Sequence, residues 1–345
     1  NADGTMEFRQ NNDIFHLSGV DQEESILVIF PDSFHAKHKE ILFLKETNEH
    51  IAVWEGAKLD KKQAFETSGI KTVYWIEQFE AVLKTLMSEA EHVYLNSNEH
   101  LRANIEVETR DARFGKWIRE TYPIHEYERG APIMHKIRAI KDAVEIELIQ
   151  KACDLTESAL RKILKTIKPG VMEYEIEADI IHEFVRNRSR GFAYTPIIAS
   201  GESACVLHYI ENNQACKDGD VILMDFGAEY GNYASDMTRC IPVNGKFTAR
   251  QKEVYNAVLR VMKAATKLNR LATLTPAGDN ALEVRFRSGS SVLTRDDERR
   301  LKVMVQNLAP NETRLQLKAY AEATGNNTSK ARRLSLSRAL AVRSF

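Results

Sequence analysis

Two aspartates, Asp225 and Asp236, are the residues of this chain best suited to do chemistry. Both lie in residues 221–243, VILMDFGAEYGNYASDMTRCIPV, where apolar or β-prone runs flank Gly231-Asn232. A Gly-Asn pair between two such runs predicts a β-hairpin with a two-residue turn. The sequence therefore predicts that one hairpin carries both aspartates, one on each strand.

The register of this hairpin decides whether the two carboxylates can act together. With the Gly-Asn pair as the turn, Tyr230 faces Tyr233 and Asp225 faces Thr238. Asp236 then lies one diagonal step from Asp225 on the same face, about 7 to 8 Å away at the backbone. Like charges that face each other destabilise a sheet, and a cation shared between them removes that cost.

Same-face acids on a hairpin are most often just the solvated side of a sheet. Here, however, residues 221–224, VILM, form a continuous apolar run, which is typical of a strand covered on both faces. Carboxylates in such a strand are rarely buried unless they are paired or bind a metal. Hard oxygen ligands suit Mn²⁺, Mg²⁺ or a similar divalent ion in a two-metal hydrolytic site.

Several segments carry a resemblance to a known family. MDFGAEYGNYASDMTR, preceded by ASGESACVLHYIENN and IRAIKDAVEIELIQKAC, resembles the catalytic domain of the Xaa-Pro aminopeptidases (aminopeptidase P), the pita-bread metallopeptidases. FRQNNDIFHLSG resembles the opening of the smaller N-terminal domain of that family. The resemblance runs from about residue 1 to about residue 267, and it implies hydrolysis of the bond between an N-terminal residue and a following proline.

The resemblance also implies roles for individual residues. In the family, two Asp, one His and two Glu hold two metal ions, most often manganese; here Asp225 would chelate one ion and Asp236 would bridge both. His208 matches a histidine that contacts the substrate or the tetrahedral intermediate. Phe192 and Tyr194 lie in the segment that lines the substrate pocket; without the resemblance they would be core aromatics, and His208 an ordinary core or surface histidine.

The chain then departs from the family pattern. The family's metal-binding histidine should follow Asp236, yet His208 is the last histidine of the chain. The acids after Asp236 lack the Gly/His-rich and Glu-Pro-Gly surroundings of the two family glutamates, so only two of the five ligands can be assigned. We therefore expect this chain to hydrolyse Xaa-Pro peptides poorly or not at all, and an inactive fusion or remnant is the alternative.

The C-terminal part of the chain has a different composition. Residues 276–345 carry 13 basic and 7 acidic residues, a net charge of +6, whereas the rest of the chain has a net charge of −7. Arginine also replaces lysine as the main cation in this part. The change falls inside the expected catalytic domain, which suggests that the chain joins two genes of different origin.

This tail has its own resemblance, to an OmpA-like domain, the βα-βα module that binds peptidoglycan in Gram-negative envelopes. Strands are expected over 281–286 and 313–323, and helices over 294–308 and 331–345. In that family an Asp and an Arg bind the diamino acid of the cell wall. Arg338 matches the arginine, and Glu322 stands where the aspartate is expected, so an envelope peptidoglycan-binding protein is a second alternative.

Together these features predict a three-part chain. The expected parts are an α/β aminopeptidase P N-terminal (creatinase-like) domain over 1–125 that lacks its start, an incomplete α+β pita-bread domain over 133–270, and a small α+β OmpA-like tail over 280–345. A hydrophobic content of 43% over 345 residues is ample for such cores.

The remaining composition narrows the expected environment and partners. No run approaches a transmembrane span, and the four cysteines have neither CxxC spacing nor the density of a disulfide scaffold. A cytoplasmic location fits best, although the tail alone would suggest the cell envelope. We expect a peptide substrate with proline second and no nucleic acid partner, because the basic run at 186–191 adjoins an acidic domain. The resemblance also allows a homo-oligomer.

Overall fold

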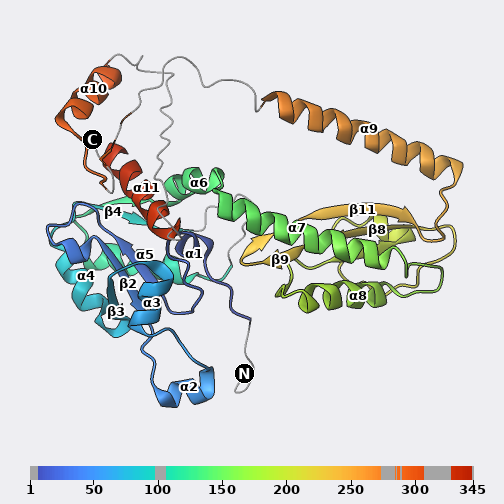
Figure 1. The fold of residues 1–345 in the computed structure, drawn as a ribbon, viewed down its shortest axis with the longest axis horizontal. Helices are drawn as coiled ribbons and strands as arrows, with labels where there is room; N and C mark the ends of the chain where they lie inside the picture. Colours follow the sequence, from blue (N-terminus) through green and yellow to red (C-terminus); the bar gives the residue numbers. More distant parts are fainter. Residues whose placement is uncertain are drawn as a thin grey trace. The chain divides into compact units, whose positions relative to one another are not determined.

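The computed structural model describes residues 7–97, 106–272, 284, 286–287, 290–306 and 328–343. The chain divides into two compact units, Asn1–Ile140 with Leu282–Phe345, and Lys141–Ala281 (Figure 1). Each unit has a hydrophobic core of its own. None of the helices in these described ranges is long and apolar enough to cross a membrane.

The first unit contains a three-stranded and a two-stranded sheet. β1 (Ile26–Ile29) pairs antiparallel with β2 (Glu40–Leu44), and β2 pairs parallel with β3 (Thr72–Trp75). β4 (His92–Leu95) and β5 (Glu126–Arg129) form the second, parallel sheet. The last four residues of β2, ILFL, are buried, as expected of a continuous apolar run covered on both faces.

Local signals in the sequence set the ends of the helices in this unit. α3 (Lys61–Ser68) begins with a capping box, in which Asp60 and Gln63 each accept a hydrogen bond from the other's backbone N–H, and it ends at Gly69 with φ 69°. The other helices before residue 141 are α1 (Asn12–Ser18), α2 (Glu49–Glu55), α4 (Phe79–Met87), α5 (Arg110–Thr121) and α6 (Ala131–Ala139), with single 3₁₀ turns at Ala36–His38 and Ile76–Gln78. Parallel strands joined through helices make this an α/β unit, as predicted.

The C-terminal part of the chain contributes α10 (Arg295–Gln306) and α11 (Thr328–Arg343), which confirms the two helices predicted there. The strands predicted over 281–286 and 313–323 fall outside the described residues, apart from isolated positions that have no strand structure. The predicted domain boundaries, including a separate tail over 280–345, stay a prediction.

α11 packs on α1 and α6 of the first unit. The Arg333 side chain is fully buried; its guanidinium donates to the Leu17 carbonyl oxygen (2.8 Å) and pairs with the Glu40 carboxylate (3.1 Å). Leu336 packs beside Leu17 and Met134. A buried cation is costly unless it is paired, so these contacts explain why this helix belongs to the first unit.

The strands of the second unit form two short antiparallel sheets. β8 (Val221–Phe226) lies between β7 (Ile197–Ser200) and β11 (Met237–Pro242). The second sheet places β9 (Ala228–Tyr230) between β6 (Gly191–Phe192) and β10 (Tyr233–Ala234). The pairs β8–β11 and β9–β10 share one register, so they are two parts of a single hairpin.

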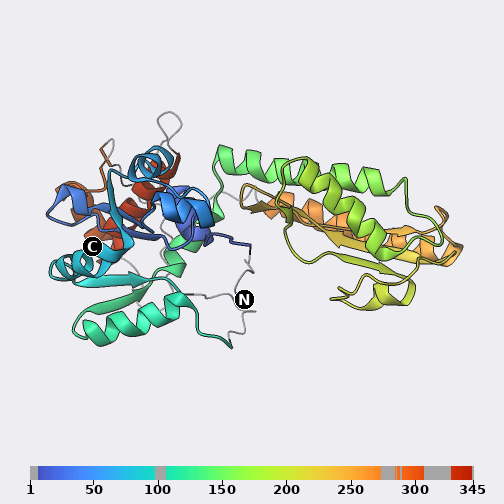
Figure 2. The same ribbon diagram turned by 90° about the horizontal axis from the view of Figure 1, so that it is seen from below.

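Two helices, α7 (Ala143–Ile163) and α8 (Glu173–Arg186), cover one face of these strands (Figure 2). The residues buried between them are apolar: Leu155, Ala159, Ile163, Ile176, Ile180, Phe184, Ile198, Ile222, Met224 and Phe226. Burial along β8 alternates, with Ile222, Met224 and Phe226 inside. The expectation that both faces of residues 221–224 are covered is therefore only half right: Val221 and Leu223 point to the other face, which loops cover in part.

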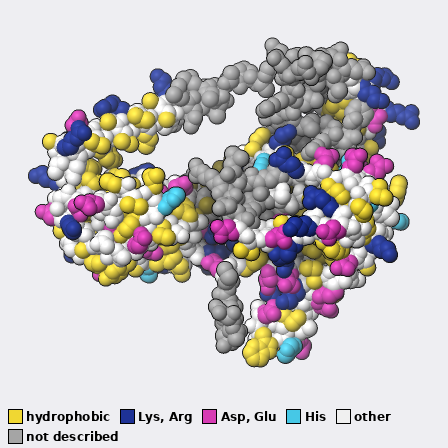
Figure 3. Space-filling model, turned by 180° about the vertical axis from the view of Figure 1, so that it is seen from behind, with side chains coloured by type: hydrophobic (Ala, Val, Ile, Leu, Met, Phe, Trp, Pro, Cys, Tyr) yellow, Lys and Arg dark blue, Asp and Glu magenta, His cyan; other side chains and the backbone are white. Residues whose placement is uncertain are grey.

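α9 (Ala249–Ala272) follows β11 and has an apolar stripe at the surface. The side chains of Val254, Val258, Val261 and Met262 recur at helical spacing and are between 48% and 69% exposed. Figure 3 shows hydrophobic side chains along this helix at the upper left. Contiguous exposed apolar surface of this kind promotes association.

We expect Val258→Lys to reduce self-association of the chain, because it places a charge in the centre of the stripe on α9. Asn256→Lys, an equal change on the opposite side of α9, is the control. The measurement is light scattering coupled to size exclusion over a range of protein concentrations. Equal association of both variants and the unchanged chain would show that the stripe is not responsible.

Candidate metal centre

The hairpin predicted around Gly231-Asn232 is present with the predicted register. Tyr230 pairs with Tyr233 and Asp225 pairs with Thr238. Both turn residues have positive φ, 58° and 66°, as a two-residue type I′ turn requires. The same register sets Asp236 opposite residue 227, and thus on the same face as Asp225.

The two carboxylates converge on one hydroxyl group. Tyr194 Oη lies 2.5 Å from Asp225 Oδ1 and 3.0 Å from Asp236 Oδ1. A tyrosine hydroxyl has one hydrogen, so it can donate to only one of the two carboxylates at a time. The other keeps an uncompensated charge beside its neighbour, which makes the pair a favourable place for a cation.

The surroundings of Tyr194 keep its hydroxyl protonated. Burial is the largest cause that raises the pKa of Tyr194, and its hydrogen bond to Asp225 and the nearby Asp236 raise it further. The phenol is therefore a hydrogen-bond donor to the carboxylates and not a competing anion. The resemblance assigned Tyr194 only to the substrate pocket. Its contacts with the two aspartates were missed because they join residues 31 and 42 positions apart in the chain.

Gly227 allows the two strands to approach closely beside the aspartates. A Cβ atom on this residue would lie 1.9 Å from the carbonyl oxygen of Ser235 and 3.2 Å from the Asp236 nitrogen. Both are backbone atoms and cannot move aside without shifting the strand. Only glycine fits here, and its position next to Asp225 and Asp236 fixes the distance between the arms that carry them.

A buried pair of hydroxyls ties this part of the hairpin to α7. Thr156 Oγ1 and Ser235 Oγ are 2.7 Å apart, and each accepts a hydrogen bond from the Ala228 backbone N–H at 2.9 Å. The Tyr233 hydroxyl adds a bond to Glu145 of α7 (2.8 Å). The hairpin is thus oriented by contacts independent of any bound ion.

The other two predicted site residues have different surroundings. His208 is exposed, in the loop after the 3₁₀ turn Gly201–Cys205. Phe192 packs edge-on against Phe184, with ring centroids 5.4 Å apart, and joins the helix-covered core. In the described residues Phe192 therefore contacts the core, and its assignment to a substrate pocket stays a prediction.

The donor set tests whether a metal ion fits. Two carboxylate oxygens on one face suit a hard divalent cation. Among the residues that the structure describes, however, no group of three or more His, Cys, Asp or Glu side chains could hold an ion. Within the described residues Asp225 and Asp236 fit as two donors of a site, and their assignment as metal ligands stays a prediction.

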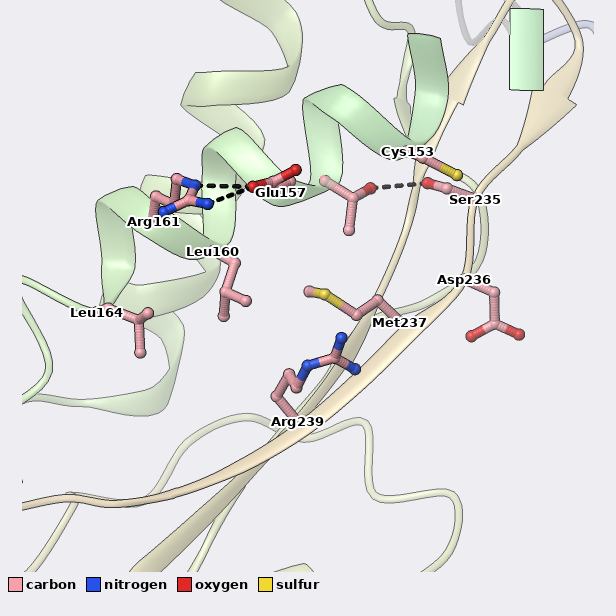
Figure 4. Close-up of a pocket in the computed structure, with 10 residues that line it drawn as sticks. Cys153, Glu157, Leu160, Arg161, Leu164, Ser235, Asp236, Met237 and Arg239 are labelled. Carbon is pink, nitrogen blue, oxygen red and sulfur yellow. Dashed lines mark hydrogen bonds and ion pairs between the residues drawn. The ribbon is translucent and has the colours of Figure 1, made fainter. Parts of the chain in front are cut away.

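A pocket of about 430 Å³ lies between α7 and β11 (Figure 4). Its wall includes Cys153 and Leu160 from α7 and Met237 and Arg239 from β11. The Met237 side chain packs toward the helix-covered core, so this pocket opens on that side of the sheet. Asp225 points to the opposite side, whereas Asp236 is among the residues that line the pocket, so the pocket borders one of the two carboxylates.

Arg338, the predicted peptidoglycan ligand, has partners within the chain. Its guanidinium donates to the carbonyl oxygens of Ser290 (3.0 Å) and Arg287 (3.3 Å) and lies over the Phe286 ring. Glu322 lies outside the described residues. These contacts stabilise the segment before α10, and the role of Arg338 in ligand binding stays a prediction.

We expect Gly227→Ala to lower the free energy of unfolding by about 3 kcal/mol or more, because the added methyl overlaps backbone. Gly245→Ala is the control: its φ is positive, 75°, unlike that of Gly227, and the space around it is open, so backbone strain alone should cost about 1 kcal/mol. Urea unfolding followed by circular dichroism measures both. Similar losses would refute the close-approach argument.

The raised pKa of Tyr194 gives a pH prediction. The unfolded phenol ionises near pH 10, whereas the folded phenol does not, so its contribution to stability is complete below pH 10 and is lost as pH rises beyond it. Between pH 8 and pH 10.5 we expect Tyr194→Phe to lose less stability than the unchanged chain. Urea titrations of both proteins at the two pH values measure this. An equal loss of unfolding free energy in the two proteins would contradict it.

Comparison with protein families agrees with this geometry. Residues 147–286 match the model of metallopeptidase family M24, and residues 1–94 match the aminopeptidase P N-terminal domain. The chain is 32% identical to the Xaa-Pro aminopeptidase of Escherichia coli K12 over 274 residues, which is 79% of this chain and 62% of that protein. It is 34% identical to the Haemophilus influenzae enzyme over 78% of this chain and 60% of that protein.

Solved structures give the same result. A putative aminopeptidase P from Bacillus anthracis superposes with a TM-score of 0.70 at 31% identity, over 76% of this chain and 62% of that one. Zinc-substituted E. coli aminopeptidase P in complex with product gives 0.66 at 31% identity, over 78% and 61%. The chain spans about three fifths of the length of these relatives. Over the matched residues it has the fold of aminopeptidase P, and residues 147–286 are similar to metallopeptidase family M24.

Proposed function

We propose that this chain carries two metal-binding carboxylates and substrate-contacting groups of an Xaa-Pro aminopeptidase, which hydrolyses the bond between an N-terminal residue and a following proline. The observation that supports this most directly is the convergence of Asp225 and Asp236 on the Tyr194 hydroxyl. The relatives named Xaa-Pro aminopeptidase supply the substrate class.

In this proposal each residue has a limited role. Asp225 and Asp236 hold divalent ions, manganese by resemblance to the family, and Tyr194 orients the two carboxylates by donating its hydrogen. Bound divalent ions supply an activated water and polarise a carbonyl oxygen. His208 donates a hydrogen bond to the substrate oxygen that gains charge. The proline preference rests on the relatives alone.

We expect this chain to bind Mn²⁺ weakly, because two carboxylates leave an ion mostly hydrated. Asp236→Asn should weaken binding at least about tenfold, since it removes one of the two charges. Asp218→Asn, a change of an exposed aspartate in the same unit, should leave binding unaltered. Electron paramagnetic resonance of free Mn²⁺ measures all three; equal affinities would place the ion elsewhere.

Activity provides a separate test. We expect the 345-residue chain to cleave a Met-Pro peptide poorly or not at all in the presence of Mn²⁺. Joining the C-terminal segment of an aminopeptidase P relative after Lys267 should restore cleavage, and Asp236→Ala should then abolish it. Efficient, chelator-sensitive cleavage by the chain alone would show that it supplies a full set of ligands.

Peptidoglycan binding through residues 280–345 is the second candidate, and an inactive fusion is the third. The two confirmed helices and the match of Arg338 support the second. A pull-down with insoluble peptidoglycan, comparing the chain with Arg338→Ala, separates it from the peptidase proposal. Retention on peptidoglycan that Arg338→Ala removes would favour the second candidate.

A further inference from the structure

Glu173, the first residue of α8, is a fully buried carboxylate with no role in the proposed reaction. Its two oxygens accept four hydrogen bonds. The donors are the Ser200 backbone N–H (2.7 Å) and hydroxyl (2.8 Å), the Tyr209 hydroxyl (2.7 Å) and the Gln214 backbone N–H (2.9 Å). A buried charge with this many donors is strongly stabilised, and removing it would leave several buried donors without an acceptor.

These donors lie in, or directly beside, one loop, residues 201–213. Ser200 ends β7, Gln214 lies at the far end of the loop, and Tyr209 directly follows His208. Burial raises the pKa of Tyr209, and its bond to Glu173 raises it further, so the phenol remains a donor. Glu173 thus binds both ends of the loop and the residue next to His208.

Glu177, one helical turn further along α8, provides a second anchor. Its carboxylate accepts a hydrogen bond from Asn212 Nδ2 (2.8 Å), and Asn212 also donates to the Pro196 carbonyl oxygen and accepts from the Ile198 N–H. Asn212 is 2% exposed and has a φ of 46°, which is unusual for a residue other than glycine. The three hydrogen bonds of the Asn212 side chain therefore stabilise the tight backbone at this end of the loop.

The loop lies over the face of the sheet that bears the carboxylates. Tyr209 packs with Ile197, Ala199 and Leu223. Ile197 is the β-partner of Asp225, and Leu223 precedes Asp225 by two residues on the same strand, so their side chains share its face. Glu173 reaches this loop from α8, while Tyr209 spans between the helix and the carboxylate face.

We propose that Glu173, supported by Glu177, is a positioning residue that holds the loop carrying His208 over the Asp225–Asp236 face. Glu173 touches neither substrate nor metal in this scheme. It acts through the hydroxyl of Tyr209 and the two ends of the loop. That the loop positions His208 for a reaction rests on the proposed function. That Glu173 holds the loop rests on the hydrogen bonds alone.

The experiment compares Tyr209→Phe and Glu173→Gln with the unchanged chain. Tyr209→Phe removes the bond to Glu173 (2.7 Å) and two longer contacts with Asn213 (3.4 and 3.5 Å) but keeps the ring, so we expect it to fold even if Glu173→Gln does not. Glu175→Gln is the matched control, since Glu175 is exposed on the same helix and glutamine preserves its capping role. Two readouts are taken on every variant: hydrogen exchange by mass spectrometry, and the His208 ring signal in a ¹³C-histidine-labelled chain with Mn²⁺ added.

We expect exchange in peptides from 201–213 to become at least tenfold faster in Tyr209→Phe, with peptides of α7 and β8 unchanged. Substoichiometric Mn²⁺ should broaden the His208 signal in the unchanged chain and in Glu175→Gln, and broaden it less in Tyr209→Phe. Unchanged exchange in the loop, or a uniform increase over the whole second unit, would overturn the positioning role.

A double variant, Asp225→Asn with Asp236→Asn, separates this inference from the proposed function. If Mn²⁺ broadens the His208 signal of this variant as much as that of the unchanged chain, the ion binds elsewhere and the proposed metal site is wrong. The exchange measurement involves no metal and still decides whether Glu173 and Tyr209 hold the loop. Faster loop exchange together with unaltered broadening of His208 would also overturn the positioning role.

Discussion

The buried contact between Thr156 and Ser235 is the interaction on which the arrangement of the second unit depends. Both hydroxyls accept from the Ala228 N–H, so a residue of α7 and a residue of the returning strand meet at one backbone group. Gly227, directly before Ala228, lets the strand pass against the Ser235 carbonyl oxygen. The two hydroxyls and the Ala228 N–H are satisfied by one another inside the protein, which favours this one arrangement of helix and hairpin.

Two consequences follow for the two sides of the sheet. On the helix side, alternate residues of β8 complete an apolar core with α7 and α8. On the other side the same alternation exposes Asp225 to Tyr194 and to the second aspartate. The period of two in a β-strand thus separates the residues that stabilise the unit from those that could hold an ion. Glu173 crosses between these sides, since it belongs to a helix and bonds to the loop over the carboxylate face.

Much of the hairpin could be predicted from the sequence, because a Gly-Asn turn and the period of a strand are local signals. They were enough to place Asp225 opposite Thr238. The links from Tyr194 and Glu173 could not be predicted in this way, since they join residues 27 to 42 positions apart. Glu173 lies in a glutamate-rich helix, EYEIEADIIHEFVR, where nothing in the local pattern distinguishes it from its exposed neighbour Glu175. Phe192 was assigned by resemblance, and only packing shows its contact with Phe184.

Because hydroxyl and backbone contacts orient the hairpin, the protein does not need an ion to build this part of its fold. In many small metal-binding domains the free energy of binding is also the free energy of folding, and a chelator unfolds them. Here we expect the two to be largely uncoupled, because the bonds of Ala228, Thr156 and Ser235 involve no cation. Metal would then raise the melting temperature only by mass action, and ions of similar size could exchange within a preformed frame.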